Sequence, residues 1–281
     1  MSILDRINKV SDNANARKAW FGLVVAIFVC IIVVPSIYVV TQMFADWDGI
    51  SDVLADSDKM SVIWRAVGVS FGLAFVVTVF DIIAGLPMAW IMVRKNFRGK
   101  NFLDTLLDMP LAFPTAVLGL SVLMFWGAPE GVDIPGLGLH LSTFMMLVLL
   151  HIIFTYPYMV RSLSGILEQI EPNYETAAMT LGASRWTAVR TITLPLFRAG
   201  LVTGFILCFA RSLSETGGTY IALSILGVES TYFTGPTYIT ENKIGLAPNE
   251  ATPEMILIST IMIILALLLL VAARFVITKM G

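Results

Sequence analysis

The most informative segment of the chain is YETAAMTLGASRWTAVRTITLPL, residues 174–196, which lies between two long apolar stretches. Four of its residues follow the i, i+3, i+4, i+7 spacing of one helical face: Tyr174, Ala177, Ala178 and Leu181. Gly182 is the residue type favoured just after a helix end. Ser184 can cap a second short helix that runs through Trp186 before Pro195 opens the next apolar stretch. The segment therefore predicts a helix, a turn and a second short helix.

The composition around this segment is that of a membrane protein. Of the 281 residues, 57% are hydrophobic and 14% are charged, and the mean hydropathy is +0.83. A helix needs about 20 apolar residues to cross a bilayer, and open strands would leave backbone groups unpaired in lipid. We therefore expect an all-α integral membrane protein with one transmembrane domain over residues 1–281. Its six predicted spans are residues 20–43, 66–93, 106–127, 141–160, 200–226 and 255–275.

The distribution of basic residues predicts the orientation. Fourteen of the 18 lysines and arginines fall before span one, at or after the end of span six, or in the loops after spans two and four. Basic residues collect on the cytoplasmic side, so we expect both termini, and a long loop over residues 161–198, to be cytoplasmic. The opposite side is rich in acids, which we expect to meet basic residues on a partner protein. Five of these acids precede span two: Asp46, Asp48, Asp52, Asp56 and Asp58.

Several function classes are excluded or disfavoured by the sequence. The net charge of −2 argues against a nucleic-acid partner, which requires a concentrated basic surface. There is no glycine-rich phosphate loop and no metal or nucleophile motif, so we expect no ATPase and no other enzyme activity on this chain. Cys30 and Cys208 lie in apolar runs and suggest packing. His140 and His151 stand apart, and we interpret His151 as a hydrogen-bonded span residue.

The 174–196 segment resembles the EAA loop of type I ABC-importer permeases. That pattern is Glu-Ala-Ala, three residues, Gly, nine residues, Ile, one residue, Leu-Pro. Six positions of this chain agree with the pattern: Ala177, Ala178, Gly182, Ile192, Leu194 and Pro195. The first position differs, because it is Thr176 and the glutamate lies one residue earlier, at Glu175. The alternative for such a helix is a position on the lipid surface.

The resemblance implies the architecture and the partners of such a permease. It implies that the loop helix docks on a cytoplasmic ABC ATPase, two of which bind ATP and Mg²⁺, so that this chain carries no cofactor. It implies a second permease, either another copy or a paralogue, a binding protein outside, and a prokaryotic cell membrane as the location. The residues expected to couple to the ATPase are Tyr174, Glu175, Thr176, Ala177, Ala178, Leu181 and Gly182.

Two further stretches resemble the molybdate, tungstate and sulfate branch of these permeases. They are DMPLAFPTAVLGLSVLMFWG, residues 108–127, and ARSLSETGGTYIAL, residues 210–223. The branch pattern has a second proline where this chain has Thr115, and Gly-Glu-Phe-Gly where it has Ser214 to Gly217. The resemblance implies a small oxyanion as cargo, while phosphate, iron and sugars remain open.

The translocation pathway is predicted from polar and helix-breaking residues inside the spans. Pro110 and Pro114 should break the hydrogen-bond ladder of span three, and Gly217 and Gly218 that of span five. Ionisable residues within spans are costly and should face the interior. The pathway candidates are Asp81, Pro114, Arg211, Ser212, Ser214, Glu215 and Gly217.

Each of these candidates also has a structural interpretation. Arg211 and Glu215 are four residues apart and can form an ion pair on one helical face. Asp81 can accept hydrogen bonds from a neighbouring helix, and the prolines and glycines can simply kink helices for packing. An ion-coupled secondary transporter that uses Asp81 and Glu215 is the competing hypothesis; an intramembrane enzyme lacks a paired nucleophile and base.

Overall fold

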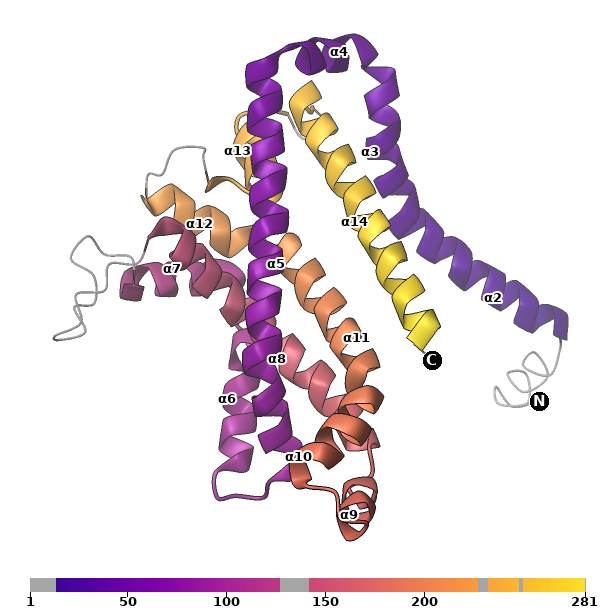
Figure 1. Ribbon diagram of the computed structural model, residues 1–281. Coiled ribbons are helices and arrows are strands. Elements are labelled where there is room, and N and C mark those ends of the chain that lie inside the picture. Colours follow the sequence, from indigo (N-terminus) through magenta and orange to yellow (C-terminus); the bar gives the residue numbers. More distant parts are fainter. Residues whose placement is uncertain (1–13, 127–141, 227–231, 248–249, 281) are drawn as a thin grey trace, which may run out of the picture.

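The computed structural model describes residues 14–126, 142–226, 232–247 and 250–280, and within these ranges all regular secondary structure is helical (Figure 1). Residues 127 and 141, at two predicted span ends, and His140 lie outside the described ranges. The helices, labelled as in Figure 1, are α2 (Ala14–Phe28), α3 (Val34–Ala45), α4 (Trp47–Ala55), α5 (Ser57–Arg94), α6 (Lys100–Ala112), α7 (Thr115–Trp126), α8 (Thr143–Gln169), α9 (Asn173–Thr180), α10 (Arg185–Ala188), α11 (Leu194–Leu213), α12 (Gly217–Leu226), α13 (Gly235–Lys243) and α14 (Pro253–Met280). Short π-helical segments, Val29–Val33 and Val189–Thr193, join α2 to α3 and α10 to α11.

The helices α5, α8 and α11 form the centre of the molecule. Figure 1 shows α5 running from α4 at the top towards α9 at the bottom, and we call these the α4 end and the α9 end. The three helices contact one another along much of their length. Near the α9 end they share a buried apolar cluster of Ala89, Met159, Leu163, Leu167, Ile170, Phe197 and Cys208. The segments described below pack against this bundle.

The lengths and apolar character of the helices are those of a multi-pass membrane protein. Four helices of the described chain are long and apolar enough to cross a bilayer, and the number rises to six if two bent helix pairs each count as one span. The first of these helices, Ala14–Ala45, has no buried residue in its most apolar stretch. Such a continuous apolar surface is stable in contact with lipid but not with water.

Span three is two helices rather than one. The axes of α6 and α7 differ by 108°, and the bend lies at Phe113 and Pro114. Phe113 is extended, with φ −89° and ψ 141°, because the proline ring disfavours helical geometry in the residue before it. Pro110 does not break the helix as expected, since it lies inside α6.

Span five is also interrupted, and earlier than predicted. The helix α11 ends at Leu213 and α12 begins at Gly217, so the break covers Ser214 to Thr216. The predicted breakers Gly217 and Gly218 instead form the first turn of α12. The residues 200–226 therefore form a long helix followed by a ten-residue helix.

The loop predicted at 161–198 is largely helical. The helix α8 continues to Gln169. From Arg185, α10, the π-helical segment and α11 follow one another directly, with a bend of 51° between Arg185–Arg198 and Gly200–Leu213. Ion pairs hold the part of α8 that follows the predicted span end at residue 160 on α6. The Arg161 guanidinium lies 2.6 Å from Asp108 Oδ2 and 2.8 Å from Asp104 Oδ1. The segment between the long helices is therefore short, and α9 is its main element.

Candidate functional site

The helix α9 ends as its sequence predicts. Gly182 has φ +93°, a conformation that costs a glycine little. Its N–H donates to Met179 O at 3.0 Å, and the Ala183 N–H donates to Ala178 O at 3.1 Å, so two of the terminal carbonyls of α9 are satisfied. Ser184 Oγ then accepts from the Thr187 N–H at 3.1 Å and caps α10.

The two faces of α9 differ in exposure. Tyr174 and Leu181 are 51% and 89% exposed, and Met179 on α9 and Trp186 on α10 are exposed as well. Figure 1 shows α9 at the extreme end of the molecule. These four exposed apolar side chains lie at this end of the molecule, and we call them together the α9 surface. Thr176 and Ala177 are also exposed, whereas Glu175 and Ala178 are partly buried.

The break between α11 and α12 is built around Glu215. Its side chain is 2% exposed, and Oε2 lies 2.8 Å from Arg211 Nη1, which gives the ion pair that the spacing predicts. Oε1 accepts from the Gly218 N–H at 2.9 Å. A carboxylate in this position satisfies an unpaired donor in the first turn of α12 and interacts favourably with the helix dipole. Glu215 therefore fixes how one helix follows the other.

His151 on α8 lies behind this break and joins both helices. Its Nδ1 lies 2.8 Å from Ser212 Oγ on α11, and its Nε2 lies 2.8 Å from Thr219 Oγ1 on α12. The three side chains are buried, and a buried network with all members paired favours one arrangement of the helices. His151 is thus hydrogen-bonded as expected. The Ser212 hydroxyl is buried and bonded to His151, so it holds α8 and α11 together and is not exposed to a passing ion.

The break also brings span three against span five. A methyl group added at Gly217 would lie 2.8 Å from Thr115 Oγ1, so the first turns of α7 and α12 are in contact. Pro114, just before α7, is therefore close to the Arg211–Glu215 region in the fold. Pro114 and Ser214 are exposed, and Arg211 and Gly217 are partly exposed. These four are the pathway candidates that remain accessible.

Asp81 does not join this group. It is fully buried on α5, near Thr155 and Cys208. Neither carboxylate oxygen has a hydrogen-bond partner in the part of the chain that the structure describes. The nearby Thr155 hydroxyl donates to His151 O at 2.8 Å.

Three residues near α9 were missed from the sequence. Arg94 and Thr193 both contact Glu175 on α9. The sequence indicated only a cytoplasmic charge at Arg94, and no pattern around Thr193 predicts a contact with α9. Trp186, predicted only as part of the second helix, adds a large exposed ring beside α9.

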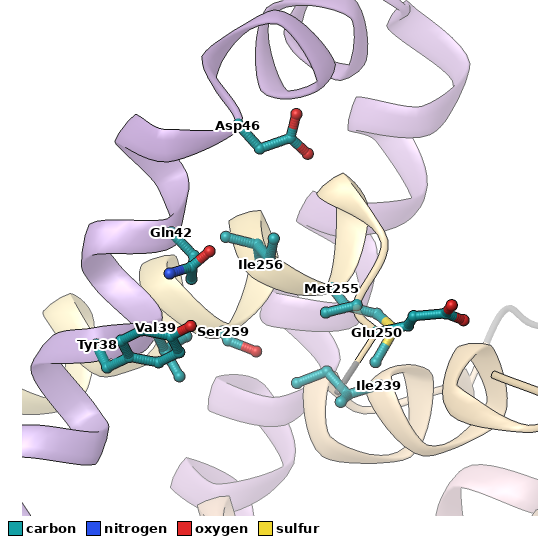
Figure 2. Close-up of a pocket in the computed structure, with 10 residues that line it drawn as sticks. Tyr38, Val39, Gln42, Asp46, Ile239, Glu250, Met255, Ile256 and Ser259 are labelled. Atoms are coloured by element: carbon teal, nitrogen blue, oxygen red, sulfur yellow. The ribbon is translucent and has the colours of Figure 1, made fainter. Parts of the chain in front are cut away.

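A separate cavity of about 420 Å³ lies near the α4 end (Figure 2). Figure 2 shows Tyr38 and Gln42 from α3 facing Ser259 and Met255 from α14 across it. The cavity contains none of the residues predicted for coupling or for the pathway. No cluster of three metal-ligating side chains was found among the described residues.

Comparison with known families gives a match over most of the chain. Residues 81–280 match the family described as "Binding-protein-dependent transport system inner membrane component". The chain is 33% identical over 202 residues to the sulfate transport system permease protein CysT of Escherichia coli, covering 68% of this chain and 69% of that protein. It is 37% identical over 166 residues to the molybdenum transport system permease protein ModB of the same species, covering 57% and 72%.

Solved structures show the same fold at low sequence identity. A chain of a bacterial ABC transporter that imports the acidic polysaccharide alginate has a TM-score of 0.73 and 16% identity, with 98% and 99% of the two chains covered. A second alginate transporter structure, in complex with a pentasaccharide-bound periplasmic protein, has a TM-score of 0.69 and 16% identity over 93% and 94%. The fold is therefore that of ABC-importer membrane subunits.

Proposed function

We propose that this chain, which belongs to the family of binding-protein-dependent transport system inner membrane components, forms half of a translocation pathway. The proposed cargo is a small tetrahedral oxyanion. Its similarity to sulfate and molybdenum permeases supports this class of cargo. Sulfate, molybdate and tungstate are the candidates. The chain itself is a transport subunit, and ATP and Mg²⁺ bind to a partner.

The proposed topology has six spans, with both termini and the α9 end in the cytoplasm of a prokaryotic cell. The spans are the four long helices, the bent α6–α7 pair, and the bent pair Arg185–Arg198 and Gly200–Leu213, which is followed by the short helix α12. The basic residues that gather at the α9 end support this orientation, because positively charged loops are retained in the cytoplasm. The acidic segment around α4 then faces outward, towards a substrate-binding protein.

The observation that carries the ATPase assignment is the α9 surface. Exposed Tyr174, Leu181 and Trp186 at the tip of a rigid helical pair are suited to a groove on another protein, since burial of such side chains drives association. Two permeases, identical or paralogous, would each present one such surface to one of two ATPases. Closure of the ATPases around ATP would then move α9 and the helices attached to it.

The proposed passage lies beside the α11–α12 break. Arg211 is the partly exposed cation there, with Ser214 and Pro114 nearby in the fold. Its pairing with Glu215 leaves a weak net attraction for an anion, which suits a site that must release its cargo quickly. Selectivity would reside mainly in the binding protein.

The test of cargo and class is ATP hydrolysis in liposomes that contain this chain with the ATPase and binding protein encoded beside it. We expect one of molybdate, tungstate and sulfate to stimulate hydrolysis and phosphate to have no effect. Hydrolysis that no oxyanion raises would eliminate the cargo assignment. Transport driven by an ion gradient without any ATPase would instead favour a secondary transporter.

The test of the docking surface is Leu181→Asp. We expect this variant to lose copurification with the ATPase, because a charge replaces the most exposed apolar side chain of the α9 surface. The matched control is Asn101→Asp, which adds the same charge to the exposed start of α6. Equal copurification of both variants would contradict the assignment of the α9 surface.

A further inference from the structure

Glu175 lies on the side of α9 that faces its own chain. Its side chain is 12% exposed, in contrast to the neighbouring Tyr174. The Thr193 hydroxyl donates to Glu175 Oε1 at 2.7 Å. Thr193 is itself buried in the π-helical segment that leads into α11. This bond therefore joins the first turn of α9 to the start of span five.

Arg94, the last residue of α5, approaches the same carboxylate. Its Nη2 lies 4.0 Å from Glu175 Oε1, and both side chains are 12% exposed. Nη2 also donates to Ile170 O at 2.7 Å, and Ile170 is the residue that ends α8. The guanidinium lies 5.9 Å from the centre of the Trp90 ring. Arg94 thus links the ends of α5 and α8 to α9.

The three side chains have different roles in this arrangement. The contact of Thr193 with Glu175 is a charge-assisted hydrogen bond, which is short and directional. The contact of Arg94 with Glu175 is too long for a hydrogen bond, so it acts through charge in a poorly solvated site. Removal of the carboxylate charge would leave the Arg94 cation in that site without its counter-charge.

We propose that Glu175 is a positioning residue that clamps α9 to α5 and α11 through Arg94 and Thr193, so that a displacement of α9 moves both helices. The proposal deepens the proposed coupling function and rests on it. Glu175 lies one residue before the first position of the EAA pattern. Its carboxylate then holds α9 on the rest of the permease and makes no contact with the ATPase. The helix α5 has 38 residues and at 1.5 Å per residue is about 57 Å long, so the clamp connects α9 with the α4 end.

The first experiment needs only the purified chain. Backbone hydrogen exchange of residues 173–182 in detergent should become roughly tenfold faster in Glu175→Gln and in Thr193→Val, a change equivalent to about 1.4 kcal/mol of local stability. Thr193→Ser, which keeps the hydroxyl, should exchange like the wild type. Glu171→Gln is the matched control, because Glu171 is exposed and its carboxylate accepts a bond from Asn173.

The second experiment measures coupling in the complex with the ATPase and the binding protein. We expect Glu175→Gln and Thr193→Val to remain assembled with the ATPase but to transport at least fivefold fewer ions per ATP, whereas Glu171→Gln and Thr193→Ser keep the wild-type ratio.

The outcomes separate the clamp from the proposed function. Unchanged exchange in Glu175→Gln overturns the clamp. Loss of ATPase binding with unchanged exchange overturns it also, because Glu175 would then be a partner contact. Faster exchange with an unchanged transport ratio overturns its role in coupling. If the wild-type chain binds no ATPase, the proposed function fails, and the exchange experiment still decides whether the clamp exists.

Discussion

Asp81 and Glu215 are both buried carboxylates inside predicted spans, but their surroundings differ. Glu215 has an arginine and a backbone N–H as partners. Asp81 has no partner for either oxygen among the described residues. An ionised carboxylate without a partner is costly in an apolar bundle. We therefore expect Glu215 to stabilise the α11–α12 break and Asp81 to lower the stability of the protein.

We expect Asp81→Asn to leave transport intact and to keep or raise the thermal unfolding midpoint in detergent. Asparagine fills nearly the same volume and removes the ionisable group. The gain should be about 1 kcal/mol or more, since an unsatisfied charged group is more costly to bury than an amide. Loss of transport in a variant that is as stable as the wild type would contradict this and would favour an ion-binding role for Asp81.

Among single residues, local roles were predicted from the sequence and long-range ones were not. The turn at Gly182 and the cap at Ser184 depend on neighbours within four residues, which the sequence shows directly. The Arg211–Glu215 pair is local in the same sense. Glu175 contacts Thr193, which is 18 positions later, and Arg94 on α5. These contacts depend on the fold and could not be predicted from neighbouring residues.

The helices α7 and α12 are short, and their packing depends on glycine. A methyl group added at Gly119 on α7 would lie 2.5 Å from Gly218 O on α12. Backbone atoms cannot move aside as a flexible side chain can, so the two helices approach as closely as glycine permits. This close approach supports the polar cluster of His151, Ser212 and Thr219 behind the break.

We therefore expect Gly119→Ala to lower the unfolding midpoint, by about 1–3 kcal/mol in free energy, because the added methyl group overpacks the contact. Gly72→Ala on α5 is the control, since a methyl group there meets nothing within 4 Å and alanine favours the helix. Thermal melts of both variants in the same detergent give the comparison. Equal stability of the two variants would be evidence against close packing of α7 and α12.

The existence of these elements was predictable, whereas their ends were less so. Long apolar runs and prolines indicate spans and bends, and Pro114 does mark the bend between α6 and α7. Pro110 nonetheless lies within α6, so a proline alone does not locate a bend. The end of α8 depends on its contacts with α6, and those contacts are tertiary.

The two ends of the molecule are chemically different and are joined by α5. The α9 end carries a group of basic residues and the exposed apolar α9 surface, and the α4 end carries a run of acids with Lys59 and Arg65. Asp56 caps α5 there by accepting from the N–H groups of Asp58 and Lys59, so it has a structural role. Asp52 and Asp58 are exposed and are free of such capping bonds to their carboxylates in the described structure.

We expect the double variant Asp52→Asn and Asp58→Asn to bind the substrate-binding protein roughly fivefold more weakly at low salt, because exposed charges at an interface rim mainly speed association and set its salt dependence. The difference from wild type should shrink at 0.5 M salt, where the screening length falls to a few ångströms. The control removes two exposed acids at the opposite end, through Glu168→Gln and Glu171→Gln, and should bind as the wild type does. Affinity measured on nanodisc-embedded complexes at both salt concentrations separates the cases. If the double variant binds like the control, the acids at the α4 end do not form the docking surface; if both lose affinity equally, the effect comes from net charge and does not report on orientation.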